Sequence, residues 1–160
     1  LEKGCTLPGF MGDIGYAQSN RERYEGFCQA LMDAGKTPNP SLCLTTPLGI
    51  DSYREEIDSF LSSLSRMPDA FVCASDYVAC ILMQLLEKRG LRVPEDVAVS
   101  GFDNNIEDLL AENLTTVQVF NEELGSRLAL QILYRIKYPH TPHEVTYLES
   151  KVLYRASTGD

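Results

Sequence analysis

The chain is 160 residues long, carries a formal net charge of −9, and is 44% hydrophobic and 23% charged. This length suits one compact domain with a sizeable core, and the composition is ordinary for a soluble α/β protein. No apolar run is long enough to cross a membrane, which argues against a membrane role. A chain this acidic repels phosphates, so we expect any contact with DNA to be made by other segments.

The cysteine pattern predicts free thiols. The five cysteines show neither CxxC pairs nor zinc-ligand spacing, and they are Cys5, Cys28, Cys43, Cys73 and Cys80. We therefore favour small buried hydrophobes over disulfides or a metal site, which suits a reducing, cytoplasmic location. The chain begins with Leu1 and shows no secretion signal, and we interpret it as a piece of a longer protein.

The first third of the chain alternates short apolar runs with amphipathic stretches. Residues 7–12 predict a weak strand that ends in a loop at Gly12-Asp13. Ser19 or Asn20 is expected to cap a helix that ends at Gly35. A second strand at 41–44 and a second helix at about 53–65 follow.

Residues 69–105 predict one βαβ unit. The apolar run 70–74 is too short for a helix and reads as a buried parallel strand. Asp76 opens an amphipathic helix that stops at Gly90, and a turn at 94–96 leads into a second buried strand ending at Asp103. Such a unit requires a right-handed crossover and a parallel sheet.

The last third of the chain predicts a loop, a strand and a long helix. Residues 104–113 have no firm period and are expected to form a loop, with a helical turn near 107–111; a strand at 115–119 follows. Asn121 is expected to cap a helix stopped near Pro139. Four apolar residues follow one face of this helix: Leu124, Leu128, Ile132 and Ile136. Strands at 145–148 and 152–154 are predicted to close the chain.

These elements predict an α/β fold: a doubly wound, mostly parallel sheet with helices on both faces. Ligands of open parallel sheets bind beyond the carboxyl ends of the strands. Ser75-Asp76 and Asp103-Asn104 follow two predicted strands and therefore lie at that end.

Several segments together resemble the effector-binding core of LacI/GalR-type bacterial transcriptional repressors, which has a periplasmic-binding-protein type I-like fold. They are Ser19–Phe27, Ala74-Ser75-Asp76, Val93–Asp103, Leu114-Thr115-Thr116 and Tyr154–Thr158. They span nearly the whole chain, and they resemble the C-terminal lobe of that two-lobed core.

The resemblance implies that Asp103 and Arg23 contact a small-molecule effector. A carboxylate at a strand end can accept two hydroxyls, although position alone favours a turn-capping Asp. The planar fork of Arg23 suits bidentate bonds to sugar hydroxyls or a carboxylate. The alternative is a surface arginine, which is our interpretation of Arg21, two residues away on a different face of the helix.

Ser19 and Ser75 are the other expected effector-binding residues. Ser19 matches a family position near the ligand but serves equally well as a plain helix cap. Ser75 stands where many relatives carry Asn, and its shorter reach leaves room for a larger effector or for water. Asp76 is interpreted as a helix N-terminal charge rather than a ligand contact. Val119 cannot hydrogen-bond where some relatives place a polar contact, which argues against a simple galactoside.

No sequence signature supports catalysis. The chain lacks a nucleophile elbow, a P-loop and a dinucleotide fingerprint, and His140 and His143 lie in a late loop far from any candidate nucleophile. A soluble periplasmic sugar-binding protein of the same fold is the alternative from another class. The unpaired cysteines and the missing secretion signal favour the regulator.

The resemblance further implies a division of the chain and a set of partners. Residues 1–119 and 141–160 would form the C-terminal lobe, and residues 120–140 would be a crossover helix that packs on the N-terminal lobe. A sugar, sugar derivative or nucleobase would bind between the lobes, without a cofactor or metal, and alter operator-DNA binding by an N-terminal helix-turn-helix outside this chain. A homodimer is expected.

Two structural expectations follow for the helices. Because Tyr77, Val78 and Cys80-Ile81 offer more apolar surface than one sheet contact needs, the helix after Asp76 is expected to contribute to the dimer. Without its lobe, the 121–137 helix is expected to dock its apolar stripe on a second copy of the chain or to swing back onto its own lobe.

Overall fold

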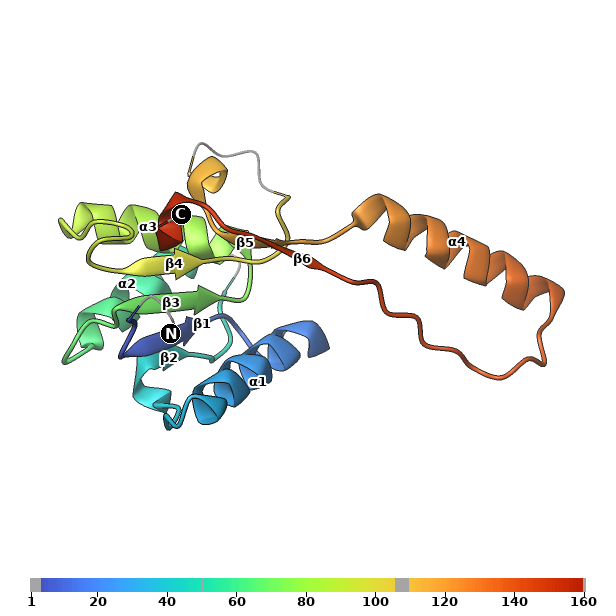
Figure 1. Cartoon of the computed structure of the whole chain (residues 1–160), viewed down its shortest axis with the longest axis horizontal. Coiled ribbons are helices and arrows are strands. Elements are labelled where there is room, and N and C mark those ends of the chain that lie inside the picture. Colours follow the sequence, from blue (N-terminus) through green and yellow to red (C-terminus); the bar gives the residue numbers. More distant parts are fainter. Residues whose placement is uncertain (1–3, 50, 106–109, 160) are drawn as a thin grey trace.

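The computed structural model describes residues 4–49, 51–105 and 110–159. Its principal elements, in chain order, are β1 (Pro8–Met11), α1 (Gln18–Asp33), β2 (Cys43–Leu44), α2 (Tyr53–Ser63), β3 (Ala70–Cys73), α3 (Asp76–Lys88), β4 (Ala98–Ser100), β5 (Thr116–Gln118), α4 (Asn121–Lys137) and β6 (Lys151–Leu153). Three short 3₁₀ turns, η1 (Pro40–Leu42), η2 (Ala111–Asn113) and η3 (Ala156–Thr158), complete them. All except α4 belong to one compact lobe, and α4 projects away from it (Figure 1).

The sheet of the lobe is parallel and has the order β2-β1-β3-β4. Parallel bridges from Ser100 to Thr115 and from Asp103 to Gln118 place β5 beside β4. The chain therefore winds outward from β1 to β2 on one side and from β3 to β5 on the other. The order reverses between β1 and β3, and this reversal is where an open α/β sheet places a ligand.

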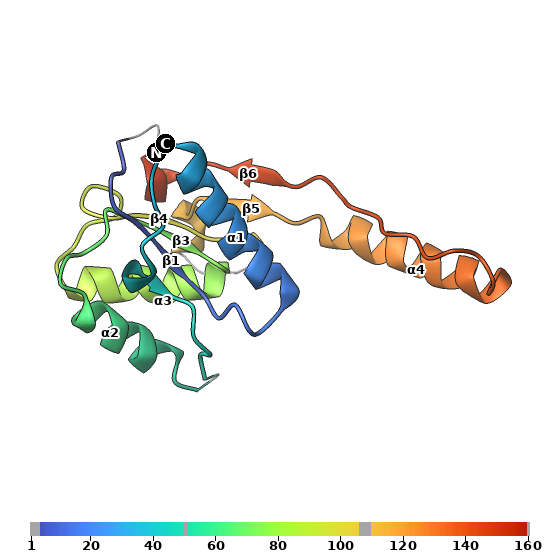
Figure 2. The same ribbon diagram turned by 90° about the horizontal axis from the view of Figure 1, so that it is seen from below.

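Helices cover both faces of this sheet (Figure 2). On one face, α1 packs Phe27 and Leu31 against Phe10 of β1 and Ala74. On the other face, α2 and α3 pack against inward-pointing strand residues in a larger cluster that includes Phe71. The predicted fold class, a doubly wound α/β lobe with a mostly parallel sheet, is confirmed.

Helix α3 is enclosed by its own lobe, which corrects the structural argument for the dimer. Val78, Cys80 and Ile81 are all buried, because α3 lies among the sheet, α2 and the segment around Leu114. Tyr77 is the one residue of that group on the surface, and its ring packs edge-on against Tyr53 with centroids 5.5 Å apart. The apolar side chains of α3 are therefore packed within the chain itself and do not indicate a dimer interface.

Helix α4 stands clear of the lobe at the end of two extended strands (Figure 1). These strands, β5 and β6, pair antiparallel, with Gln118 opposite Lys151. None of the residues of α4 is buried, and the predicted apolar stripe (Leu124, Leu128, Ile132 and Ile136) is 49–74% exposed. The expectation that this helix swings back onto its own lobe is therefore wrong. Docking of the stripe on another surface stays a prediction.

Several predicted element boundaries are wrong in detail. Helix α1 begins at Gln18, so neither Ser19 nor Asn20 is its cap, and Asn121 likewise lies inside α4. The predicted strand at 145–148 has no regular structure, because it runs beside α4 with no neighbouring strand to pair with. The predicted helical turn at 107–111 falls largely outside the described residues.

All five cysteines lie among the described residues and none of them forms a disulfide, and Cys73 and Cys80 are buried in the core. Burial raises the pKa of the Cys73 thiol far above its ordinary value, which keeps it protonated and unreactive. Among the described residues, no helix has the length and apolar character needed to cross a membrane.

Candidate functional site

Three loops meet at the carboxyl ends of β1, β3 and β4. The first of them passes very close to the second, because a side chain at Gly12 would place its Cβ 2.2 Å from the Cβ of Ala74. Asp13 shapes the same loop by accepting hydrogen bonds from the backbone N–H groups of Gly15 and Tyr16. Glycine at position 12 thus brings the β1 and β3 loops together at the switch point of the sheet.

Arg23 reaches this point from the second turn of α1. Its guanidinium lies 3.6 Å from the centre of the Phe102 ring, donates to the backbone carbonyl of Ala74 at 2.5 Å, and approaches the Asn20 side chain at 3.5 Å. A guanidinium stacked on an aromatic ring and bonded to a main-chain carbonyl has its plane fixed by the protein. The prediction that Arg23 faces the carboxyl ends of the strands agrees with this position.

Asp103 lies opposite Arg23, with 3.5 Å between its Oδ1 and the Nη2 of the arginine. Burial raises the pKa of the Asp103 carboxyl; the charge of Arg23 opposes this shift, and the negative charge of Asp76 adds to it. The side chains of Arg23 and Asp103 retain 21% and 28% of their exposure. This pair is thus open to a ligand, and at 3.5 Å it is loose.

Burial also lowers the pKa of Arg23, although the charges of Asp103 and Asp76 oppose that effect. An arginine remains protonated at any physiological pH, so the consequence is energetic rather than chemical. Its positive charge is incompletely solvated, and a ligand that offers oxygen acceptors would improve its environment.

The structure does not join Ser75 and Ser19 to the pair by hydrogen bonds. Ser75 caps α3, because its hydroxyl accepts from the backbone N–H of Val78 at 3.4 Å. Ser19 is exposed in the first turn of α1, four residues before Arg23 and hence on the same face of that helix. Ser75 therefore has a structural role that the sequence did not assign to it, while Ser19 lies one helical turn before Arg23.

Asp76 has the helix N-terminal position that the sequence predicted, but it does more than charge a helix end. The residue is 2% exposed, and its carboxylate accepts hydrogen bonds from the Thr116 hydroxyl at 2.6 Å and from the backbone N–H of Asn104 at 2.7 Å. Burial raises the pKa of Asp76, and these hydrogen bonds and the charge of Arg155 oppose the shift. This carboxylate is enclosed by protein and is not available to a ligand.

Two residues at the site, Phe102 and Arg155, were missed from the sequence, and Asn104 was placed at the ligand end of the sheet without a role. Phe102 was assigned only to the end of a strand, although its place directly before Asp103 was a usable signal. Arg155 donates to the side chain of Asn104 at 2.8 Å and to the carbonyls of Ala111 and Leu114. It appeared only within the Tyr154–Thr158 segment of the resemblance, and nothing local to that segment indicates its distant partners.

The arrangement suits a ligand rich in hydroxyl groups. A hydroxyl can donate to the carboxylate of Asp103 and accept from the guanidinium of Arg23, and two neighbouring hydroxyls can do both at once. In the described part of the chain, no group of three or more His, Cys, Asp or Glu side chains is arranged to hold a metal ion. A polar pair at the switch point of a parallel sheet is typical of ligand-binding α/β proteins.

The chain belongs to the periplasmic binding protein-like domain family, whose sequence profile matches residues 1–158. It is 28% identical over 161 residues to the HTH-type transcriptional repressor PurR of Photobacterium profundum, covering 100% of this chain and 48% of that protein. The chain thus spans about half the length of the curated relatives it matches.

Solved structures agree with this assignment. A putative LacI-family regulator from Sanguibacter keddieii superposes with a TM-score of 0.84 at 27% identity, covering 99% of this chain and 60% of that one. The transcriptional regulator CelR in complex with cellobiose gives 0.85 at 28% identity, covering 98% and 48%. The resemblance to LacI/GalR-type regulators is confirmed, and the relatives are named as transcriptional regulators rather than enzymes.

Proposed function

We propose that the chain is the C-terminal lobe of the effector-binding core of a LacI/GalR-type transcriptional regulator. In this proposal residues 1–119 and 141–160 form the lobe, and residues 120–140 cross to an N-terminal lobe. The projection of α4 from the paired strands β5 and β6 supports that division (Figure 1). The regulator is favoured over a periplasmic sugar-binding protein because the curated relatives are named as repressors.

The observation that carries the proposal is the pairing of Arg23 with Asp103 over Phe102 at the switch point. The guanidinium is held by the ring and by the carbonyl of Ala74, so its orientation does not depend on the loose contact with the carboxylate. An effector can replace that contact without disturbing the arginine. Preorganised donors of this kind reduce the entropic cost of binding.

The site favours a neutral, polyhydroxylated effector. The opposite charges of Arg23 and Asp103 cancel, so an added phosphate would meet a repelling carboxylate beside the guanidinium. One face of the Phe102 ring is already covered by Arg23, which leaves less aromatic surface on which a nucleobase can stack. A relative is named as a ribose operon repressor, and the CelR structure holds cellobiose. These names agree with a sugar as the effector.

The proposal places DNA binding in a separate segment and the effector between two lobes. Because this chain is strongly acidic, an N-terminal helix-turn-helix would supply the basic surface for operator DNA. Full-length regulator is proposed to be a homodimer, in keeping with the two-fold symmetry usual for such DNA-binding proteins. Sedimentation of the intact protein at micromolar concentration checks this, and a monomer at that concentration would reject it.

A thermal-shift screen of the intact protein tests the proposed effector class. Neutral sugars, sugar phosphates and nucleobases are added separately to wild type and to Asp103→Asn. A ligand at a hundred times its Kd stabilises the native state by about 2.7 kcal/mol, so a true effector raises Tm clearly. We expect a neutral sugar to raise the Tm of wild type and to have little effect on the variant. An equal rise in Tm for both proteins would show that Asp103 does not contribute to effector binding.

A further inference from the structure

The loop that follows β4 has an unusual backbone. Asp103 has a φ angle of 115°, which a side-chain-bearing residue keeps only when surrounding contacts hold it there, and Asn104 has a φ angle of 51°, in the left-handed region that Asn tolerates. The first of these residues carries the carboxylate that faces Arg23. The position of that carboxylate therefore depends on whatever fixes this loop.

Three contacts fix Asn104 through its backbone N–H and the two polar groups of its side chain. Its backbone N–H donates to Asp76 Oδ2 at 2.7 Å, and its side-chain amide donates to Gln118 Oε1 at 2.5 Å. Its side-chain carbonyl accepts from Arg155 at 2.8 Å. The backbone contact to Asp76 acts directly on the peptide that follows Asp103, whereas the other two hold the side chain.

The surroundings of Asp76 leave it little freedom to move. Its other oxygen, Oδ1, accepts from the Thr116 hydroxyl at 2.6 Å, so both oxygens are engaged. A side chain at Gly101 would place its Cβ 2.2 Å from the same Oδ1. The carboxylate thus fills a slot between α3, β5 and the β4 loop, and glycine at 101 is what makes room for it.

We propose that Asp76 is a positioning residue for the site. Its buried carboxylate holds the peptide after Asp103 and thereby aims the Asp103 side chain at Arg23 without touching a ligand itself. The functional part of this inference rests on the proposed effector site. Its structural part concerns the loop alone and is tested without any effector.

The same carboxylate connects the site with the strand that leads to α4. Thr116 is the first residue of β5, and it shares the carboxylate of Asp76 with Asn104. A shift of β5 relative to α3 therefore acts on the Asp103 loop through one group. Asp76 accordingly couples the conformation of the crossover strand to the geometry of the site.

NMR of the isotopically labelled chain tests the structural part with Asp76→Asn. The amide oxygen of Asn can accept from the Asn104 N–H while its NH₂ group donates to the Thr116 hydroxyl, which can accept as well as donate, so the variant replaces a charged acceptor of the Asn104 N–H by a neutral one. Replacing a charged acceptor by a neutral one corresponds to about a tenfold change in local opening. We expect exchange of the Asn104 amide to accelerate about tenfold more than exchange in β3, and the three-bond HN–Hα coupling of Asp103 to change as its φ relaxes.

Ile57→Ala in α2 is the matched control, because Ile57 is fully buried in the core cluster that α2 and α3 form with the sheet and is not among the hydrogen-bonding partners of Asp103 or Asn104. It should accelerate exchange throughout the core and leave the Asp103 coupling at the wild-type value. A merely structural role for Asp76 predicts the same result for both variants. Identical behaviour of the two, or an unchanged coupling in Asp76→Asn, would overturn the proposal.

Acidification of the wild type supplies a test that needs no folded variant. Protonation of Asp76 removes the negative charge from the group that accepts from the Asn104 N–H, so protection of the Asn104 amide should fall before protection in β3 does. Thr116 and the charged groups Arg155, Arg23 and Asp103 all lie close to this carboxylate. If Asn104 and β3 lose protection together, Asp76 does not position the loop. Because no effector is added, this result stands even if the proposed function fails.

Discussion

At the scale of single residues, the site pairs an arginine whose orientation is fixed with an aspartate whose backbone is strained. Arg23 is held by Phe102 and by a main-chain carbonyl, whereas Asp103 sits on a backbone with φ of 115°. A non-glycine residue in such a conformation costs on the order of 1–3 kcal/mol. The fold sustains that cost through the contacts to Asn104, and strain of this kind is concentrated where a protein binds ligands.

Replacement of Arg23 by Ala should weaken effector binding by about 1.5–3 kcal/mol, the range for a hydrogen bond to a charged group. The effect on stability should be smaller, since the pair with Asp103 is partly exposed and 3.5 Å apart. Arg21→Ala removes the same side chain from an exposed position of the same helix and serves as the control. Isothermal titration with the sugar identified by the screen measures both. Equal losses for the two variants would show that only net charge matters.

Asp103→Asn should stabilise the fold most at neutral pH. Burial raises the pKa of this carboxyl in the folded state, so the folded chain binds the proton more tightly than the unfolded chain. The stability of wild type therefore falls as pH rises from the ordinary aspartate pKa of about 3.9 through the raised folded value. Asp103→Asn lacks this loss of stability. Its higher stability relative to wild type should therefore vanish in acid. Denaturant unfolding across that range measures the difference, and an advantage that grows on acidification would contradict the assignment.

The location of Arg23 and Asp103 at the carboxyl ends of the strands was predictable from the sequence, while their contact with an effector stays a prediction; the residues that support them were not predictable. Both sit at positions fixed by local spacing, one in an early helix turn and one directly after a buried strand, and the resemblance assigned them a role. Asp76, Asn104 and Arg155 act through contacts that span 28 to 51 positions of the chain. Such pairings are set by the packing of whole elements and leave no local sequence pattern.

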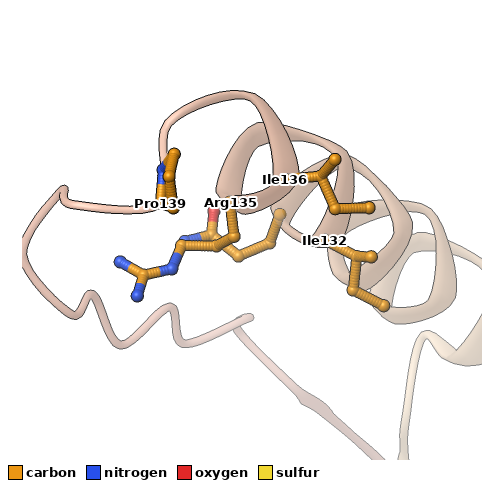
Figure 3. Close-up of a pocket in the computed structure, with 5 residues that line it drawn as sticks. Ile132, Arg135, Ile136 and Pro139 are labelled. Atoms are coloured by element: carbon orange, nitrogen blue, oxygen red, sulfur yellow. The ribbon is translucent and has the colours of Figure 1, made fainter.

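At the scale of elements, α4 is the helix whose apolar face is left exposed. Ile132, Arg135, Ile136 and Pro139 line a shallow, mostly apolar hollow on its outer half (Figure 3). Burial of a large aliphatic side chain is worth about 1.5–3 kcal/mol, so a stripe of this kind favours a partner surface. In our proposed division of the chain, that surface belongs to the N-terminal lobe.

Leu128→Ala should therefore destabilise the intact protein by about 2–5 kcal/mol while leaving this chain alone nearly unchanged. Leu128 is 61% exposed here, so its truncation removes little packing from the lobe. Leu130→Ala is the matched control, because Leu130 is 62% exposed and points to another face of α4. Denaturant unfolding of both proteins measures the effect. If Leu130→Ala is as costly as Leu128→Ala in the intact protein, the stripe is not the buried face.

Long periodic segments were predicted well, whereas short and edge elements were not. The bounds 121–137 of α4 were predicted correctly, because apolar residues at every fourth position and a proline after the last of them are strong local signals. The predicted strand at 145–148 failed because a strand requires a neighbour, which its residues cannot reveal. The caps at Ser19 and Asn121 were wrong because the N-cap positions are the non-polar Ala17 and Phe120, which make no side-chain cap hydrogen bond and so leave no capping signal in the sequence.

At the scale of the whole molecule, charge decides which partners the chain can meet by itself. With a net charge of −9, it should show no measurable affinity for operator DNA, whereas the proposed full-length regulator should bind it with a strong dependence on salt. Fluorescence anisotropy with labelled duplex at two salt concentrations tests both proteins. DNA binding by this chain alone would contradict our placement of the DNA-binding surface outside it.

Because Gln118 pairs antiparallel with Lys151, the segment that contains α4 leaves the lobe and returns to it at the same place. The chain could therefore be closed there by a short hairpin turn such as Asn-Gly, with residues 119–150 excised. Each halving of a closed loop lowers its entropic cost by about 0.6 kcal/mol, so the shortened lobe should fold at least as stably and with more local contacts. Thermal unfolding of the shortened chain measures this stability. A shortened chain that cannot fold would mean that the lobe depends on residues 119–150.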